Sequence, residues 1–242
     1  MQEKRLIKIA GVEYNFNIFI ERRNSTRVSI TNHGVNIRIP RHLSRTNREK
    51  TILELTHWAA KRLQSSSLGK QKTKRYLHDD LLRTHSKIYK LQIEIRDSQK
   101  NFSKIQGNYI IFKISDKHDD EIKQKYISKQ LQKLLAKHHH GELYSKIHKL
   151  NQEHFGKDIN KVCWKYTKSR WGACHCTRKE IEISTKLLFA PMEILEYVII
   201  HELAHLIEAN HSKRFWNIVK SCDPNYKKKI KWLHANGNEL QI

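Results

Sequence analysis

The sequence predicts an α+β fold, in which a small strand-rich N-terminal region precedes a compact domain built from a β-hairpin and one apolar helix. In residues 5–39, apolar and polar side chains alternate at period two, which is typical of half-buried strands. In residues 192–209, apolar side chains recur at spacings of three and four, which is typical of a helix buried on most of its surface. With 242 residues, 38% of them hydrophobic, the chain is long enough to bury such elements around a core.

The first predicted domain covers residues 1–75 and consists of strands and one helix. Pro40 ends the strand-rich part. Residues 44–64 carry apolar side chains at helical spacing behind Ser44, which we expect to cap the helix. The stretch 65–75 combines serine and glycine with basic residues, and it is the best candidate for a linker.

The second predicted domain covers residues 76–242, and it begins with two further strands at 87–96 and 108–114. A long helical stretch follows at about 119–150, with apolar residues on one face and Gly141 as its candidate break. We find no internal repeat in the sequence.

A β-hairpin is expected directly before the apolar helix. Residues 161–176 predict a strand that runs into a glycine turn, and residues 179–187 predict its partner strand. Pro191 suits the first turn of the helix that follows, because a proline there loses no intrahelical hydrogen bond.

The net charge of +23 is concentrated in the front of the chain. Residues 1–150 carry a net +18, whereas residues 151–242 carry +5. Such an excess predicts a polyanionic partner, and nucleic acid bound through the basic N-terminal region is the candidate. The alternative is a compositional bias towards lysine, since 32 of the 47 basic residues are lysine. Both interpretations remain open at this point.

The remaining bulk features predict a cytoplasmic protein without a membrane span. The longest apolar run, residues 197–200, is too short to cross a bilayer, and the first ten residues lack the apolar stretch of a signal peptide. The four cysteines are too few and too clustered for a disulfide framework, so free thiols are expected. Nothing in the sequence indicates the oligomeric state.

The segment HELAHLIEANH, residues 201–211, carries the chemistry of the chain. His201 and His205 are four residues apart, so a helix presents both imidazoles on one face, as a zinc ion requires. Glu202 is offset by about 100° from His201, which suits a general base that contacts a water molecule instead of the metal.

A third metal ligand is needed beside this pair. His211 is the first candidate, provided that the helix ends near Asn210, and Glu208 is held in reserve. Metzincin peptidases have a third histidine at the same spacing, but Glu208 stands where their turn glycine belongs, and no methionine follows the motif. The chain is therefore not predicted to be a metzincin.

The motifs together resemble the YgjP-like zinc metallopeptidase family, a relative of the SprT-like and WLM peptidases. The resemblance is carried by SRWGACH at 169–175, EYVIIHELAHLIEANHSKRFW at 196–216 and PNYKKKIKWL at 224–233, and more loosely by residues 21–43. Ala173 departs from the serine that is usual in the family.

This resemblance implies a compact zincin-type metallopeptidase domain. It also implies that His201, His205 and His211 bind Zn2+ and that Glu202 acts as the general base.

Three further residues are expected beside the cleft, because the hairpin should flank the motif helix: Lys165, Arg170 and Trp171. Arg170 is a candidate for holding a substrate carbonyl or phosphate, and the alternative is an ordinary structural ion pair.

Three other groups are given structural roles. The three histidines at 138–140 are interpreted as a solvated helix face, and Phe215 and Trp216 as core residues. A second zinc site is disfavoured by poor ligand spacing at the remaining cluster, Cys163, Cys174, His175 and Cys176.

The favoured function is a zinc-dependent hydrolase, with peptidase as the leading version and a peptide or protein as substrate. One alternative keeps the metal site and makes its substrate a nucleotide or another phosphoanhydride. Another alternative is a non-enzymatic nucleic-acid-binding protein that is stiffened by structural zinc.

Overall fold

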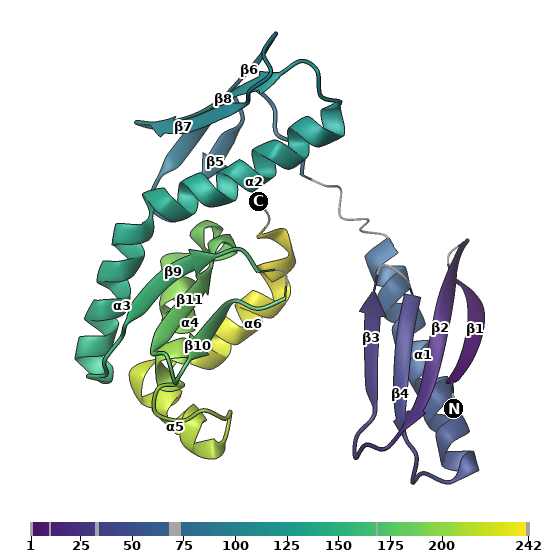
Figure 1. Ribbon diagram of the computed structural model, residues 1–242. Helices are drawn as coiled ribbons and strands as arrows, with labels where there is room; N and C mark the ends of the chain where they lie inside the picture. The colour runs from purple at the N-terminus through teal and green to yellow at the C-terminus, as the bar shows by residue number, and fades with distance from the viewer. Residues whose placement is uncertain (1, 10, 32–33, 68–73, 168, 241–242) are drawn as a thin grey trace. The chain divides into compact units, whose positions relative to one another are not determined.

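The computed structural model describes residues 2–9, 11–31, 34–67, 74–167 and 169–240 (Figure 1). It confirms an α+β fold. The chain divides into two compact units, Met1–Thr73 and Lys74–Ile242, and each is described by itself.

The first unit is a four-stranded sheet with one helix. The strands lie in the order β1–β2–β4–β3, where β1 and β2 are antiparallel, β2 and β4 parallel, and β4 and β3 antiparallel. Apolar residues of the sheet and of the helix form its core. The elements are β1 (Gln2–Ile9), β2 (Val12–Glu21), β3 (Arg27–Thr31), β4 (Gly34–Pro40) and α1 (Arg45–Ser67).

The second unit begins with a sheet of the same design. Its strands lie in the order β5–β6–β8–β7, again with a parallel central pair between two antiparallel pairs. Two of them, β5 and β7, are short strands that the sequence did not predict. The elements are β5 (Leu81–Arg83), β6 (Ile88–Arg96), β7 (Phe102–Gln106), β8 (Tyr109–Ser115) and α2 (Asp120–His138).

The two sheets are a structural repeat with a constant offset of 75 residues, so the expectation of no internal repeat is wrong. Phe16 pairs with Val35 in the first sheet, and Leu91 pairs with Ile110 in the second. The offset also relates the two helix starts, Arg45 and Asp120. The sequence hides the repeat because only seven of the 57 positions that align 7–63 with 82–138 are identical.

The rest of the second unit holds a three-stranded sheet and the remaining helices. The sheet has the order β10–β11–β9, so β10 lies at an edge. The elements are α3 (His140–His154), β9 (Lys161–Lys165), β10 (Gly172–His175), β11 (Glu180–Ser184), η1 (Thr185–Phe189), α4 (Met192–Ala204), α5 (Lys213–Cys222), α6 (Tyr226–Asn236) and η2 (Gly237–Glu239).

The hairpin before the motif helix differs from the predicted one. Its antiparallel partners are β10 and β11, whereas β9 pairs with β11 in parallel. Gly172 therefore opens a strand instead of forming a turn.

The predicted helix at 119–150 is two helices, α2 and α3, which meet at His139. The predicted linker at 65–75 begins too early, because residues 65–67 still belong to α1, and 68–73 lie outside the described residues.

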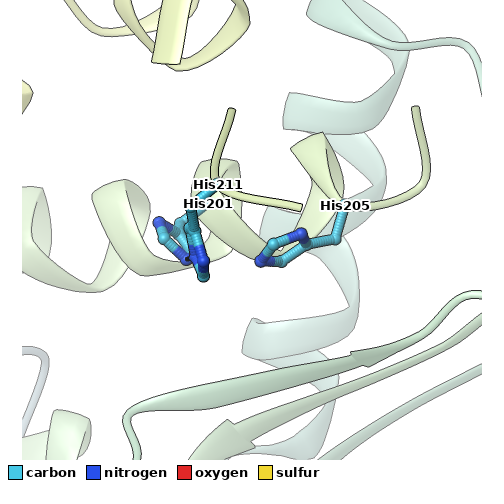
Figure 2. Close-up of side chains that lie close together, drawn as sticks. All are labelled: His201, His205 and His211. Carbon is cyan, nitrogen blue, oxygen red and sulfur yellow. Dashed lines mark hydrogen bonds between the residues drawn. The ribbon is translucent and has the colours of Figure 1, made fainter. Parts of the chain in front are cut away.

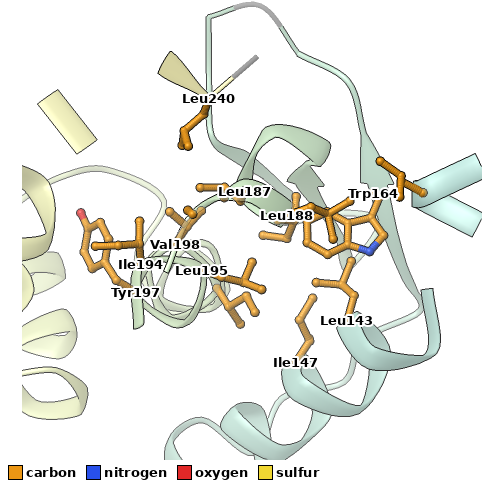
Figure 3. Packing of buried hydrophobic residues seen from close by; sticks show 14 of the residues in the cluster. Leu143, Ile147, Trp164, Leu187, Leu188, Ile194, Leu195, Tyr197, Val198 and Leu240 are labelled. Atoms are coloured by element: carbon orange, nitrogen blue, oxygen red, sulfur yellow. The ribbon is translucent and has the colours of Figure 1, made fainter. Parts of the chain in front are cut away.

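The core of the second unit surrounds α4. Figure 3 shows Ile194, Leu195, Tyr197 and Val198 of this helix beside Leu187 and Leu188 of η1, with side chains of α3 and β9 close by. The helix is apolar around most of its circumference, and neighbouring elements pack against it on several sides. This packing fixes the helix that carries the first half of the histidine motif.

Within the described residues, no helix combines the length and the apolar character needed to cross a membrane.

Candidate metal centre

Helix α4 holds His201 and Glu202 in its last turn. The helix begins after Pro191 and ends at Ala204, so His205 is its cap residue. It is thus shorter than the predicted 192–209, although Leu206 and Ile207 continue the apolar spacing. Backbone hydrogen bonds from both of these residues to the last turn of the helix form the turn that follows.

This turn brings His211 close to His201 and His205. Ser212 caps the next helix, α5, by accepting a hydrogen bond from the backbone N–H of Phe215 at 3.3 Å. His211 therefore lies directly before a fixed helix start. Figure 2 shows the rings of His201, His205 and His211 gathered together, and one ligand nitrogen from each lies within 4.8 Å of the others.

The three histidines fit a zinc ion. Two nitrogens bound to one tetrahedral zinc at about 2.0–2.1 Å lie about 3.3 Å apart. The Nε2 atoms of His201 and His211 are 3.0 Å apart. Nδ1 of His205 is 3.1 Å from the carbonyl oxygen of Glu208, which favours a proton on Nδ1 and leaves the Nε2 lone pair free.

Electrostatics also favour the neutral form that binds a metal. Burial, together with the nearby His205 and His211, lowers the pKa of His201 to about 3. Burial lowers the pKa of His205 as well. Neutral imidazole is the form of histidine that ligates zinc.

Glu202 is a buried carboxylate, with 6% of its surface exposed. Burial raises its pKa to about 8, and the charge of Arg170 and a hydrogen bond from the Cys174 backbone act in the opposite direction. Gly172 lies against it, because a Cβ there would be 2.6 Å from Cγ and Oε1 of Glu202. The glycine of β10 therefore leaves the space that this side chain occupies.

One cavity of about 730 Å³ joins these groups. The three histidines and Glu202 lie in its wall beside residues of β10, and the C-terminal helices supply apolar side chains, among them Trp216, Ile230 and Leu233. The site is thus open to a ligand much larger than water.

The structure separates the three residues that were expected beside the cleft. Arg170 and Trp171 line the cavity, whereas Lys165 is not among its lining residues. Lys165 Nζ is 2.7 Å from Oε1 of Glu182, and Arg170 Nη2 is 3.5 Å from Oε2 of the same carboxylate. Glu182 thus connects both cations.

The sequence analysis did not predict a role for Glu182, because this residue belongs to no recognisable motif. Its side-chain partners come from β9, from the segment before β10 and from β10 itself. The packing of Trp171 was also missed: a Cβ at Gly237 would lie 2.5 Å from its ring.

Burial and distances also decide the roles that were expected for Glu208, Phe215 and Trp216. The carboxylate of Glu208 lies 3.7 Å from Arg214 and is not part of the histidine cluster. Phe215 is fully buried and stacks on His205, but Trp216 lines the cavity, so it is more than a core residue.

The prediction of a solvated face at 138–140 is wrong for His139, which is only 2% exposed. Its ring nitrogens contact the hydroxyl of Tyr89 and the carboxylate of Glu142, both at 2.9 Å. These polar partners allow an imidazole to be buried at the junction of α2 and α3.

All four cysteines are free. Sγ of Cys174 and Sγ of Cys176 are 3.7 Å apart. In the described part of the chain, the only cluster of three or more side chains suited to a metal is the histidine triad.

Comparison with known proteins supports the interpretation of the three histidines as part of a metallopeptidase domain. A family model described as a YgjP-like metallopeptidase domain matches residues 24–236. The chain belongs to the YgjP-like family. The resemblance seen in the sequence motifs is thereby confirmed. The metallopeptidase domain that this model describes supports a metal-dependent hydrolase, for which zinc is the typical ion.

Individual relatives of this YgjP-like chain match over shorter stretches. It is 38% identical over 47 residues to the UTP pyrophosphatase of Escherichia coli (strain K12), a stretch that is 19% of the chain and 28% of that protein. The chain thus spans less than a third of this relative.

Two similar solved structures are metallopeptidase zymogens, Pyrococcus abyssi abylysin and Methanocaldococcus jannaschii jannalysin. Their TM-scores are 0.35 and 0.32, with 21% and 22% sequence identity. Each match covers 38% of this chain, and 93% and 96% of those chains respectively.

The contact between Gly172 and Glu202 leads to a prediction. Gly172→Ala should lower turnover by about tenfold or more without removing zinc, because the added methyl group must displace the carboxylate, and a shift of about 1 Å costs a large factor in rate. Turnover and zinc content of the purified variant test this.

The control is Gly141→Ala, where the added Cβ meets no atom within 4 Å. Its turnover should equal that of the wild type. Equal turnover in the Gly172 variant as well would show that the position of Glu202 is unimportant.

Proposed function

We propose that this chain is a zinc-dependent hydrolase that cleaves peptide bonds. His201, His205 and His211 hold the zinc ion, and Glu202 is the general base. The observation that carries the proposal is the meeting of three imidazoles and one buried carboxylate in the wall of a single large cavity.

A zinc ion held by three imidazoles supplies Lewis acidity towards water and towards a substrate carbonyl. Glu202 accepts the proton of the attacking water and returns it to the leaving nitrogen. Burial gives this carboxylate a high proton affinity, and a cation at the histidines would lower its pKa again towards the ionised form. A hydrogen bond from the Cys174 backbone holds the carboxylate, in the space that Gly172 leaves free.

The strand β10 supports a peptide substrate. It is an edge strand of its sheet, and Gly172, Ala173 and Cys174 line the cavity. An extended peptide can pair with such an edge through main-chain hydrogen bonds, while its side chains enter neighbouring pockets. The apolar wall formed by Trp216, Ile230 and Leu233 suits an apolar side chain of that peptide.

A purely structural zinc site is less well supported. Structural zinc is usually enclosed by four protein ligands, whereas a catalytic site leaves a position open. Among the described residues, the cluster offers three histidines and no fourth histidine, cysteine or carboxylate ligand.

A substrate screen tests the proposal. Zinc-loaded protein should cleave members of a mixed peptide library, detected by mass spectrometry as new termini, and should leave nucleoside triphosphates intact. Phosphoanhydride hydrolysis is the competing activity, because Arg170 lines the cavity and one relative bears the name UTP pyrophosphatase. Release of pyrophosphate without peptide cleavage would replace the peptidase with this alternative.

A further inference from the structure

A second pocket lies in the first unit, within the strand-rich N-terminal part. It has a volume of about 550 Å³ and is lined by Arg22, Arg23, Asn24, Arg41 and His42. None of these five residues is acidic. Among the described residues, no carboxylate lies within ion-pair distance of Arg22 or Arg41, and the nearest one to Arg23 is Glu21, at 3.7 Å from Nη1. The Nε atom of Arg23 is buried without a hydrogen-bond partner in the described structure.

The parallel pairing of β2 and β4 creates this pocket. Glu21 and Pro40 end the two strands side by side, so the residues that follow them leave the same edge of the sheet. A hydrogen bond of 2.9 Å from the Arg41 backbone N–H to the Glu21 carbonyl fixes the two exits together. The ends of parallel strands are a frequent position for ligand sites, because the diverging chains leave a crevice.

The repeated sheet shows that the fold does not require these cations. At the positions 75 residues later, the same exits carry Asp97, Ser98, Gln99, Asp116 and Lys117. The fixing hydrogen bond is retained there, from the Asp116 N–H to the Arg96 carbonyl at 3.1 Å.

In the second sheet, two side chains at the equivalent positions neutralise one another. Lys117 Nζ lies 3.6 Å from Oδ1 of Asp97, across the gap between the two exits. The equivalent positions of the first sheet hold Arg22 and His42, which cannot form such a pair. An anion in the pocket would supply the missing negative charge.

The type of cation also argues for a site. The chain has 32 lysines and 15 arginines, yet residues 22–48 contain seven arginines and no lysine. A general bias towards lysine therefore does not explain this segment. Arginine binds phosphate with two parallel hydrogen bonds, whereas lysine offers a point charge. In addition, Arg48 of α1 donates from Nη2 to the carbonyl oxygen of Arg41.

We propose that Arg22, Arg23, Arg41 and His42 form a binding site for the phosphate groups of a small polyphosphate. Arg22 and Arg41 bind phosphate oxygens from the two strand exits, Arg23 adds a third guanidinium, and Asn24 offers an amide. The concave shape favours a compact ligand over the backbone of a nucleic acid, which needs an extended stripe of charge. The site shares no residue with the histidine cluster.

The test measures binding of inorganic pyrophosphate to the full chain by calorimetry, after zinc has been removed so that the histidine cluster cannot capture the anion. The wild type should bind at 0.05 M salt. The double variant Arg22→Gln, Arg41→Gln should bind about tenfold more weakly or worse, because each lost charge-assisted hydrogen bond costs a factor of this order.

The matched control is Arg27→Gln, Arg83→Gln, which removes the same charge from two exposed arginines outside the pocket. It should change the affinity less than twofold. A second variant, Arg22→Asp with His42→Lys, copies the ion pair of the second sheet, and it should fold and lose binding. The proposed site would be overturned by any of three results: an equal loss of pyrophosphate affinity in the control, retained binding in both pocket variants, or no binding by the wild type. Tighter binding of a single-stranded oligonucleotide, weakened equally by pocket and control variants, would replace it with general attraction to nucleic acid.

Discussion

Replacing His201 with alanine should remove zinc and hydrolytic activity together. The wild type should contain about one zinc ion per chain, because the described residues offer one cluster of three imidazoles. The variant retains only His205 and His211, so it should contain almost none after dialysis. Elemental analysis and the peptide assay measure the two effects on the same samples.

The same substitution should also remove the effect of zinc on stability. A ligand at 100 times its dissociation constant contributes about 2.7 kcal/mol, so added zinc should raise the unfolding temperature of the wild type but not that of the variant. His57→Ala, at an exposed position of α1, is the control and should behave as the wild type. Full zinc content in the His201 variant would contradict the assignment of this ligand.

Replacing Glu202 with glutamine should produce a different result: zinc content is kept, while turnover falls by about 100-fold or more. Glutamine preserves the size of the side chain but cannot accept the proton of water. The Michaelis constant should change less than the turnover number, because the loss lies in the chemical step. Steady-state kinetics on the peptide found in the screen measure both constants.

Glu193→Gln provides the matched control on the same helix, since this residue is exposed in the first turn of α4. Its kinetics should equal those of the wild type. If the Glu202 variant retained near-wild-type turnover, Glu202 would not be the base.

Local patterns predicted the elements whose signal lies within a few residues. The alternation in residues 5–39 gave the strands of the first sheet, and the spacing of His201 and His205 placed two imidazoles on one helix face. The return of His211 could also be proposed from spacing. The exact end of α4 could not, because Leu206 and Ile207 continue the apolar pattern after the helix has turned away.

Features that depend on distant partners were not predictable in this way. The burial of His139 depends on Tyr89, which is 50 residues away. The space for Glu202 depends on Gly172 in a different element. Strand alternation gives the buried face of β9 but not its neighbour, so its parallel pairing with β11 was missed.

The repeated sheets have a consequence for folding during synthesis. Two sheets with the same strand order and register are able to exchange strands, and such misassembly is a characteristic failure of repeated domains. The low identity between the copies reduces this risk, because a strand transplanted into the other copy would meet side chains of the wrong size. Divergence of the two copies therefore protects the newly made first sheet from pairing with the strands of the second sheet.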